Sequence, residues 1–225
     1  MEKGYGRVVA TFFRGLESDN SKDWWQRNRA TYDDVIKPSF LKLLSGIESF
    51  GPWRVYRPNN DTRFVSGKGP YKTFIGAVAE RPNGVGAFVQ LSAKGLLVGT
   101  GNPMPAPDQL TKLREAIADQ RSGSELLAAI TAVERLGGIV HGGRYDPLKR
   151  VPCGYAADHP RAAHLMWKGL EINHRPDSPP WLDMPSAPAE IEALIERGEP
   201  LHRWLATNVG PSSLTAEERF APKKR

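Results

Sequence analysis

The stretch KTFIGAVAERPNGVGAFVQLSAKGLLVGT, residues 72–100, decides the fold class of this 225-residue chain. Residues 72–80 and 85–93 are typical of β-strands, and the RPNG between them holds an Asn-Gly pair, which tolerates the positive φ of a tight hairpin turn. Lys94-Gly95 makes a second tight turn, and a third strand follows over 96–100. Apolar residues alternate with smaller or polar ones along 85–93, as in a half-buried strand. The stretch therefore predicts an antiparallel β-meander.

The beginning of the chain is expected to be helical. A short apolar stripe over 8–16 predicts a first helix. Asn20 or Ser21 can cap a second helix, which carries two adjacent tryptophans. Pro38 either kinks this helix or opens a third one. A short β candidate follows at 55–56, before the meander begins.

Helical patterns return after the meander. Asp108 is expected to cap a helix, and Ser122 or Ser124 to start another, which Gly137-Gly138 stops. The later elements predicted are a strand at 139–140, a helix over 159–166, a strand over 170–173, and closing amphipathic helices around 191–195 and 201–205. Helices thus flank a contiguous run of strands. This favours an α+β fold, an antiparallel β-meander flanked by helices, over βαβ alternation.

The composition predicts a cytoplasmic globular protein without a membrane partner. No stretch approaches the roughly 20 apolar residues that span a bilayer, and the beginning of the chain lacks the apolar core of a signal peptide. The one cysteine, Cys153, cannot form an internal disulfide. Because no repeat or long linker divides the chain, we expect a single α+β domain over residues 1–210 and a flexible tail over 211–225.

The densest chemistry lies in the basic segment, RVYRPNNDTRFVSGKGPYKT, which covers residues 54–73. Glycines there let the backbone approach a ligand closely, and the cationic side chains suit a phosphate or carboxylate. Tyr71 can stack on a base or donate its hydroxyl. The segment holds five cations against the single acid Asp61: Arg54, Arg57, Arg63, Lys68 and Lys72.

Two other interpretations of the basic segment stay open. Its charges can belong to a solvated loop, or Asp61 can pair structurally with Arg63 or Arg57. The sequence GKGPYKT is not a phosphate-binding P-loop, because that pattern needs Lys and Ser/Thr directly after its second glycine and before a helix. The net charge of +6 permits a nucleotide or nucleic acid partner without requiring one.

Three blocks of the chain resemble a family of conserved hypothetical proteins, domain-of-unknown-function family 2461. The first block holds Asn20, Trp24, Trp25, Asn28, Arg29 and Tyr32, and the second is DTRF followed by KGPYKT. The third block holds Pro152, Gly154, Tyr155, His159, Pro160, Leu165 and Lys168. The chain departs from the family pattern at four positions: Asn60, Val65, Gly67 and Cys153.

The resemblance implies one globular α+β domain and no particular activity. With the basic segment, it directs attention to nine candidate ligand-binding residues: Arg57, Asp61, Arg63, Lys68, Tyr71, Lys72, Tyr155, His159 and Lys168. We expect Arg63, Lys72 and Lys168 to converge in one pocket or groove. No metal site is expected, since the histidines lack Cys or acidic partners at metal spacing, and no cofactor is implied.

The leading hypothesis is a domain that binds a phosphate-bearing or other anionic ligand, nucleotide or nucleic acid, through the basic segment. One alternative is an enzyme acting on a phosphorylated substrate, with His159 or Tyr155 as proton donor. The other is a protein-docking module, which should present a flat apolar patch.

Overall fold

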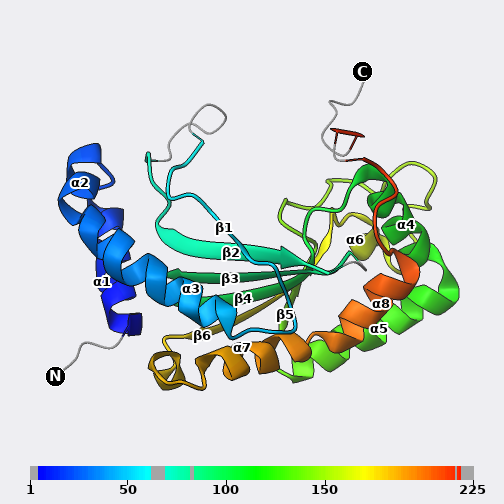
Figure 1. Ribbon diagram of the computed structural model, residues 1–225. Coiled ribbons are helices and arrows are strands. Elements are labelled where there is room, and N and C mark those ends of the chain that lie inside the picture. Colours follow the sequence, from blue (N-terminus) through cyan, green and yellow to red (C-terminus); the bar gives the residue numbers. More distant parts are fainter. Residues whose placement is uncertain (1–4, 62–68, 82–83, 216, 219–225) are drawn as a thin grey trace. The chain divides into compact units, whose positions relative to one another are not determined.

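The computed structural model describes residues 5–61, 69–81, 84–215 and 217–218. Its strands form one six-stranded sheet in the order β1-β2-β3-β4-β6-β5 (Figure 1). Antiparallel pairing joins β1 to β2 and β5 to β6. The bounds are β1 (Arg54–Val55), β2 (Phe74–Glu80), β3 (Gly86–Ser92), β4 (Gly95–Asn102), β5 (Ile139–His141) and β6 (Leu170–Asp177). The consecutive strands β2, β3 and β4 are neighbours, which confirms the predicted meander and the α+β class.

The chain divides into two compact units, each built from separate segments. Unit 1 comprises residues 1–79, 87–98 and 175–194, and unit 2 comprises residues 80–86, 99–174 and 195–225. That residues 1–210 form a single domain stays a prediction, as does the flexible tail over 211–225. No helix among the described residues is both long and apolar enough to cross a bilayer.

The helices of unit 1 are α1 (Tyr5–Ser18), α2 (Lys22–Ala30), a π-helical turn η1 (Thr31–Ile36), α3 (Lys37–Ser45), a 3-10 turn η2 (Pro180–Asp183) and α7 (Ala187–Glu196), of which the last two residues belong to unit 2. Ser21 caps α2, accepting from the Trp24 amide at 3.1 Å. Pro38 lies in the first turn of α3, so it opens a third helix, which was one of the two predicted alternatives. The chain passes from α2 to α3 through η1 without a break, which the sequence pattern did not indicate.

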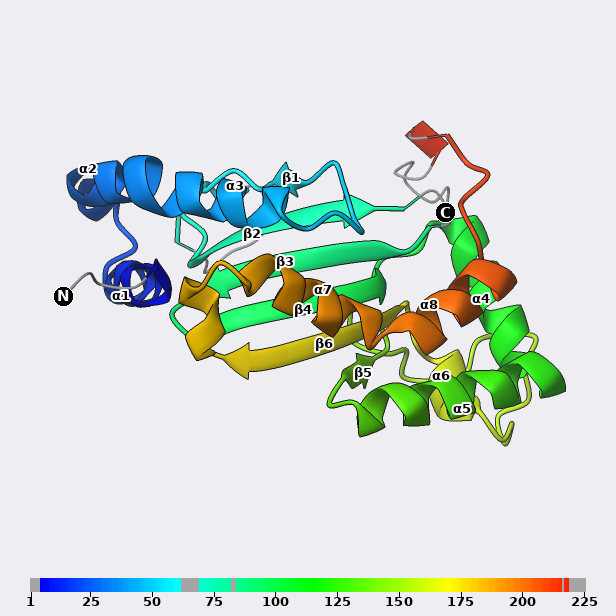
Figure 2. The same ribbon diagram turned by 60° about the horizontal axis from the view of Figure 1, so that its bottom comes forward.

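The two faces of the sheet in unit 1 differ in burial. Along β2, Ile75, Ala77 and Ala79 are at most 3% exposed, while Phe74 and Val78 between them are half-buried. A similar alternation runs along β3, where Gly86, Phe88 and Gln90 are half-buried while Ala87, Val89 and Leu91 are buried. Figure 2 shows α3 and α7 lying over one face of the sheet in unit 1. The opposite face carries no helix among the described residues of this unit.

The helices of unit 2 are α4 (Pro107–Ala118), α5 (Gln120–Arg135), the short α6 (Ala162–Leu165) and α8 (Glu199–Asn208). Two cap predictions were wrong. Ala106, not Asp108, is the N-cap of α4, and Asp119, not Ser122 or Ser124, is the N-cap of α5. The predicted strand at 170–173 continues to Asp177 in β6.

Candidate functional site

The basic segment lies in unit 1, and its described part continues the sheet and then forms a loop. The Tyr56 amide extends the β1–β2 pairing by donating to the Gly76 carbonyl at 2.9 Å. Further along, Asn59 pairs with Tyr71 in an isolated antiparallel bridge. Two predicted ligand-binding residues lie outside the described residues: Arg63 and Lys68.

Tyr71 packs inside unit 1 rather than facing solvent. Its ring is 8% exposed and stacks on Trp25, with ring centroids 4.4 Å apart and an interplanar angle of 10°. The Asn20 amide clamps the Tyr71 backbone, donating to its carbonyl at 2.9 Å and accepting from its N–H at 3.0 Å. Asn60 also donates to the Tyr71 carbonyl, at 2.9 Å, and to the Gly69 carbonyl, at 2.8 Å. These contacts favour a structural role for Tyr71 over stacking on a base.

Lys72 holds the loop of the basic segment together. Its Nζ donates to the Arg57 carbonyl at 2.9 Å and to the Asn59 carbonyl. Burial and the nearby Arg57 guanidinium lower the Lys72 pKa, while the Asp61 carboxylate raises it. Arg57 and Asp61 form an ion pair with an N–O distance of 3.8 Å. Lys72 therefore adds positive charge beside Arg57 and fixes the backbone on which that charge lies.

The clamp on Tyr71 gives a stability prediction. Asn20→Ala should lower the free energy of unfolding by about 1–3 kcal/mol, because a part-buried N–H loses its acceptor and a carbonyl loses one donor. Chemical denaturation followed by tryptophan fluorescence measures this, since Trp25 reports directly on the Tyr71 stack. The matched control is Asn28→Ala, because the Asn28 amide bonds only within α2. Equal, small effects of the two substitutions would argue against the clamp.

Three aromatic rings lie on the helix-free face of the sheet in unit 1. We call Tyr56, Phe74 and Phe88 the aromatic face. Their rings are half-buried, and the Phe88 centroid lies 6.0 Å from that of Tyr56 and 6.5 Å from that of Phe74. Gly76 lies beneath them, and a Cβ there would approach Phe88 to 3.0 Å and Phe74 to 3.2 Å. Because Gly76 has no side chain, the Phe74 and Phe88 rings can lie close to the backbone of the sheet.

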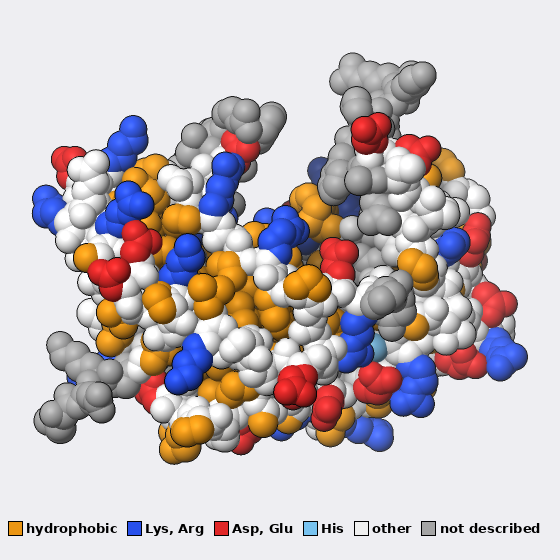
Figure 3. All heavy atoms as spheres, viewed as in Figure 1, with side chains coloured by type: hydrophobic (Ala, Val, Ile, Leu, Met, Phe, Trp, Pro, Cys, Tyr) orange, Lys and Arg blue, Asp and Glu red, His pale blue; other side chains and the backbone are white. Residues whose placement is uncertain are grey.

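Cations border the aromatic face. Arg54 is exposed and pairs in register with Val78, so it shares the face of Tyr56 two residues further on. Arg57, the next cation along, has a side chain that is 67% exposed. Figure 3 shows lysine and arginine side chains in blue on the face of the molecule seen in Figure 1. A half-buried aromatic surface and exposed cationic groups therefore occur together in this unit.

In unit 2, His159 and Arg161 cap the end of α4. The His159 Nε2 lies 3.3 Å from the Ala118 carbonyl, and its Nδ1 accepts from the Arg161 amide at 3.0 Å. Arg161 is 5% exposed and donates to three carbonyls at the same helix end. Because both ring nitrogens of His159 have partners, the geometry favours a structural role over the predicted one of proton donor.

Lys168, another predicted site residue, lines a pocket of about 510 Å³ in unit 2. It is half-buried and forms no ion pair within the part of the chain that the structure describes. Tyr155 lies elsewhere in the unit, and its pKa is raised by burial and by the Glu115 carboxylate of α4. No group of three or more metal-ligating side chains occurs among the described residues.

A comparison with known families covers all three sequence blocks. The family model DUF2461, conserved hypothetical protein, matches residues 8–204. The chain belongs to this family. No curated protein and no solved structure matches it significantly.

The geometry shows what several DUF2461-like residues do in this chain. Asn20 and Trp25 of the first block meet Tyr71 of the second in unit 1, so these two blocks share one packing site. The third block belongs to unit 2, where it supplies the α4 cap and Lys168. Because Arg63 lies outside the described residues and the other two cations belong to different units, convergence of Arg63, Lys72 and Lys168 stays a prediction.

The aromatic face was not predicted from the sequence. Tyr56 was noted only as part of a short strand, and Phe74 and Phe88 were assigned to the meander without a role. The available signal was that β2 carries apolar residues at both parities, Phe74 and Val78 as well as Ile75. A strand with two apolar faces needs cover on both, and the described helices of unit 1 cover one of them.

Proposed function

We propose that unit 1 binds single-stranded nucleic acid, with bases on the aromatic face and phosphates toward Arg54, Arg57 and Lys72. The observation that carries this proposal is the aromatic face itself, three half-buried rings on a helix-free sheet surface with cations beside it.

Stacking supplies the sequence-independent part of such binding. Every base has a π-face, and antiparallel sheets with exposed aromatic side chains are a recurrent platform for unpaired bases. Phe74 meets Phe88 edge-on at 86°, and Tyr56 is tilted by 43° against Phe88. The rings therefore do not fill each other's faces by parallel stacking, which leaves ring surface for a base.

The cations supply the phosphate contacts. The Arg57–Asp61 pair is long, at 3.8 Å, and both side chains are more than a third exposed, so the pair itself contributes little stability. A phosphate can replace Asp61 as the partner of Arg57 at small cost. The five cations against one acid in 54–73 give the segment an excess positive charge that suits a polyanion.

Fluorescence anisotropy with a labelled single-stranded oligonucleotide, titrated at about 50 and about 200 mM salt, tests the proposal. Three phosphate contacts predict that log K falls with log salt with a slope of about −2, since each contact on a single strand contributes about −0.7. Arg54→Gln should weaken binding and reduce that slope by about 0.7. Tyr56→Leu should lower affinity at least about fivefold and leave the slope unchanged, because stacking releases no counterions.

Lys42→Gln is the matched charge control, because Lys42 is exposed on α3, which covers the other face of the sheet. Lys42→Gln should bind with the same affinity and the same salt dependence as the unmodified protein. Absence of binding at the lower salt concentration would refute the proposal. The proposal would also be refuted if duplex and single strand bound with equal affinity and Tyr56→Leu left the affinity unchanged. The positive charge alone would then account for binding. Binding of a mononucleotide alone would indicate a free nucleotide as the ligand.

A further inference from the structure

The pocket in unit 2 is a second candidate site, separate from the aromatic face. Its volume of about 510 Å³ lies in the range of small-molecule sites. Its lining joins the end of β2, the end of β4, the first turn of α4, Tyr145, Lys168 and the segment after α8. Residues from six parts of unit 2 thus line one space.

Hydrogen bonds between distant residues hold the walls of this pocket. Gln109 is 6% exposed, and its amide accepts from the Ala106 N–H at 3.0 Å and donates to the Gly210 carbonyl at 2.8 Å. The neighbouring Asp108 carboxylate accepts from Ser212 Oγ and from the Ser213 N–H, each at 2.8 Å. The segment after α8 is therefore pinned to the start of α4, which keeps the pocket shaped before any ligand arrives.

The charge of the lining favours an anion. Two cations, Arg81 and Lys168, line the pocket with the single carboxylate of Glu80. Lys168 forms no ion pair with any described residue, although its own backbone is fixed by an N–H bond to the Gly142 carbonyl at 3.0 Å. A half-buried ammonium without a carboxylate partner, held on a fixed backbone, is a suitable partner for a ligand anion.

The remaining lining is apolar or aromatic. Met104 is 47% exposed and Tyr145 is 53% exposed, both high values for such large side chains. With Pro105 and Leu110 they offer an apolar wall beside the cations. We propose that this pocket binds a small organic anion, whose carboxylate or phosphate contacts Lys168 and whose apolar or aromatic part packs against Met104 and Leu110.

Isothermal titration calorimetry with four probes tests this: phenyl phosphate, benzoate, inorganic phosphate and benzyl alcohol. Phenyl phosphate or benzoate should bind saturably, and the tighter of the two identifies the anionic group. Inorganic phosphate and benzyl alcohol should each bind more weakly, since each lacks one half of the ligand. Lys168→Gln should weaken the preferred probe about tenfold or more, the loss of one charge-assisted hydrogen bond. Met104→Ala should weaken the aromatic probes and leave inorganic phosphate unchanged.

Lys112→Gln, an exposed lysine of α4 outside the pocket lining, is the matched control and should change nothing. Tyr56→Leu should also leave these titrations unchanged, so this inference and the nucleic acid proposal can fail separately. The inference is overturned if no probe binds saturably, or if Lys168→Gln and Lys112→Gln have equal effects. Loss of probe binding in Tyr56→Leu but not in Lys168→Gln would also overturn it.

Discussion

Arg161→Leu is expected to lower the free energy of unfolding by about 3 kcal/mol, the effect of removing a buried cation that donates three hydrogen bonds to backbone carbonyls. The guanidinium donates to the carbonyls of Ile117 at 2.5 Å and of Ala118 and Asp119 at 2.9 Å each. The last carbonyls of a helix have no partner within it, and the negative end of the helix dipole favours a cation there. Leucine fills the space but leaves the Ile117 carbonyl buried without this donor.

Urea denaturation of the unmodified protein and of Arg161→Leu measures this difference in the free energy of unfolding. Arg161→Lys should fall between them, since lysine keeps the positive charge but lacks the planar fork that reaches several carbonyls. If Arg161→Leu changes stability by less than about 0.5 kcal/mol, the usual range for a surface substitution, then the cap contributes nothing to folding.

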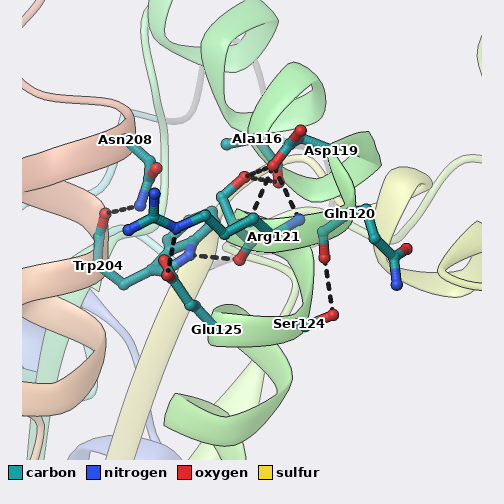
Figure 4. Close-up of polar contacts among 9 residues, drawn as sticks. Ala116, Asp119, Gln120, Arg121, Ser124, Glu125, Trp204 and Asn208 are labelled. Atoms are coloured by element: carbon teal, nitrogen blue, oxygen red, sulfur yellow. Dashed lines mark hydrogen bonds and ion pairs between the residues drawn. The ribbon is translucent and has the colours of Figure 1, made fainter.

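The Arg161 cap also predicts that a glycine-to-alanine substitution in α5 lowers stability, although such a substitution in a helix usually raises it. Replacing a helical glycine by alanine normally stabilises a helix by about 1 kcal/mol. At Gly123, however, a Cβ would lie 2.3 Å from Arg161 Nε and 2.5 Å from the Ile117 carbonyl oxygen. Gly123→Ala should therefore destabilise the protein. Ser124→Ala, one residue along at an exposed position (Figure 4), is the control and should stay within about 0.5 kcal/mol.

Local patterns were sufficient to predict most elements of the fold. The meander followed from alternation and two tight turns, and Ser21 and Pro38 marked helix starts by their local chemistry. These signals are local because a turn or cap is satisfied within a few residues. The π-helical turn between α2 and α3 has no comparable sequence mark, so the continuous passage between these helices was missed.

The cap predicted for α4 failed because its side chain has distant partners. The residues around Asp108 predict that it caps a helix, but its carboxylate accepts from Ser212 and Ser213, more than a hundred residues further on. At α5 the predicted Ser122 donates its backbone N–H to the actual cap, Asp119, which also accepts from the Arg121 amide (Figure 4). Competition between a local and a distant donor depends on the tertiary fold, which propensity alone does not contain.

The candidate site shows the same limit. Tyr71 looks like a ligand-facing residue because glycine, proline and lysine surround it in the sequence. Its partners Asn20 and Trp25 lie about fifty residues earlier and draw it into the core. The aromatic face was missed for the converse reason. Its rings look like core residues, and only the absence of covering helices in unit 1 distinguishes them.

His202 should make stability depend on pH between about 6.5 and about 4. His202 is 2% exposed, and its Nε2 lies 2.7 Å from Thr100 Oγ1. Burial, and then the Arg81 guanidinium, lower the His202 pKa from 6.5 to about 4. The Glu199 carboxylate, 3.7 Å from Nδ1 and half exposed, does not offset this burial.

The direction follows from the two states. The folded protein holds His202 neutral down to about pH 4, whereas the unfolded chain takes up a proton near pH 6.5. Its contribution to stability is therefore complete above pH 6.5 and is lost progressively as the pH falls to about 4. Each pKa unit corresponds to about 1.4 kcal/mol, so the loss amounts to about 3 kcal/mol.

Urea denaturation at a series of pH values from about 7.5 to about 4 measures the loss, and His202→Gln isolates it. Glutamine keeps a polar group near Thr100 but does not titrate, so the variant should be less stable at neutral pH and lose less stability on acidification. The pKa values of His164 and His174 are also lowered by burial, but both histidines remain in the variant and cancel in the difference. Asp108 titrates lower, with a pKa of about 2.

His141→Gln, at an exposed position of the same unit, is the control, and its stability should depend on pH as that of the unmodified protein does. Parallel curves for His202→Gln instead would mean that burial does not hold this histidine neutral in the folded state.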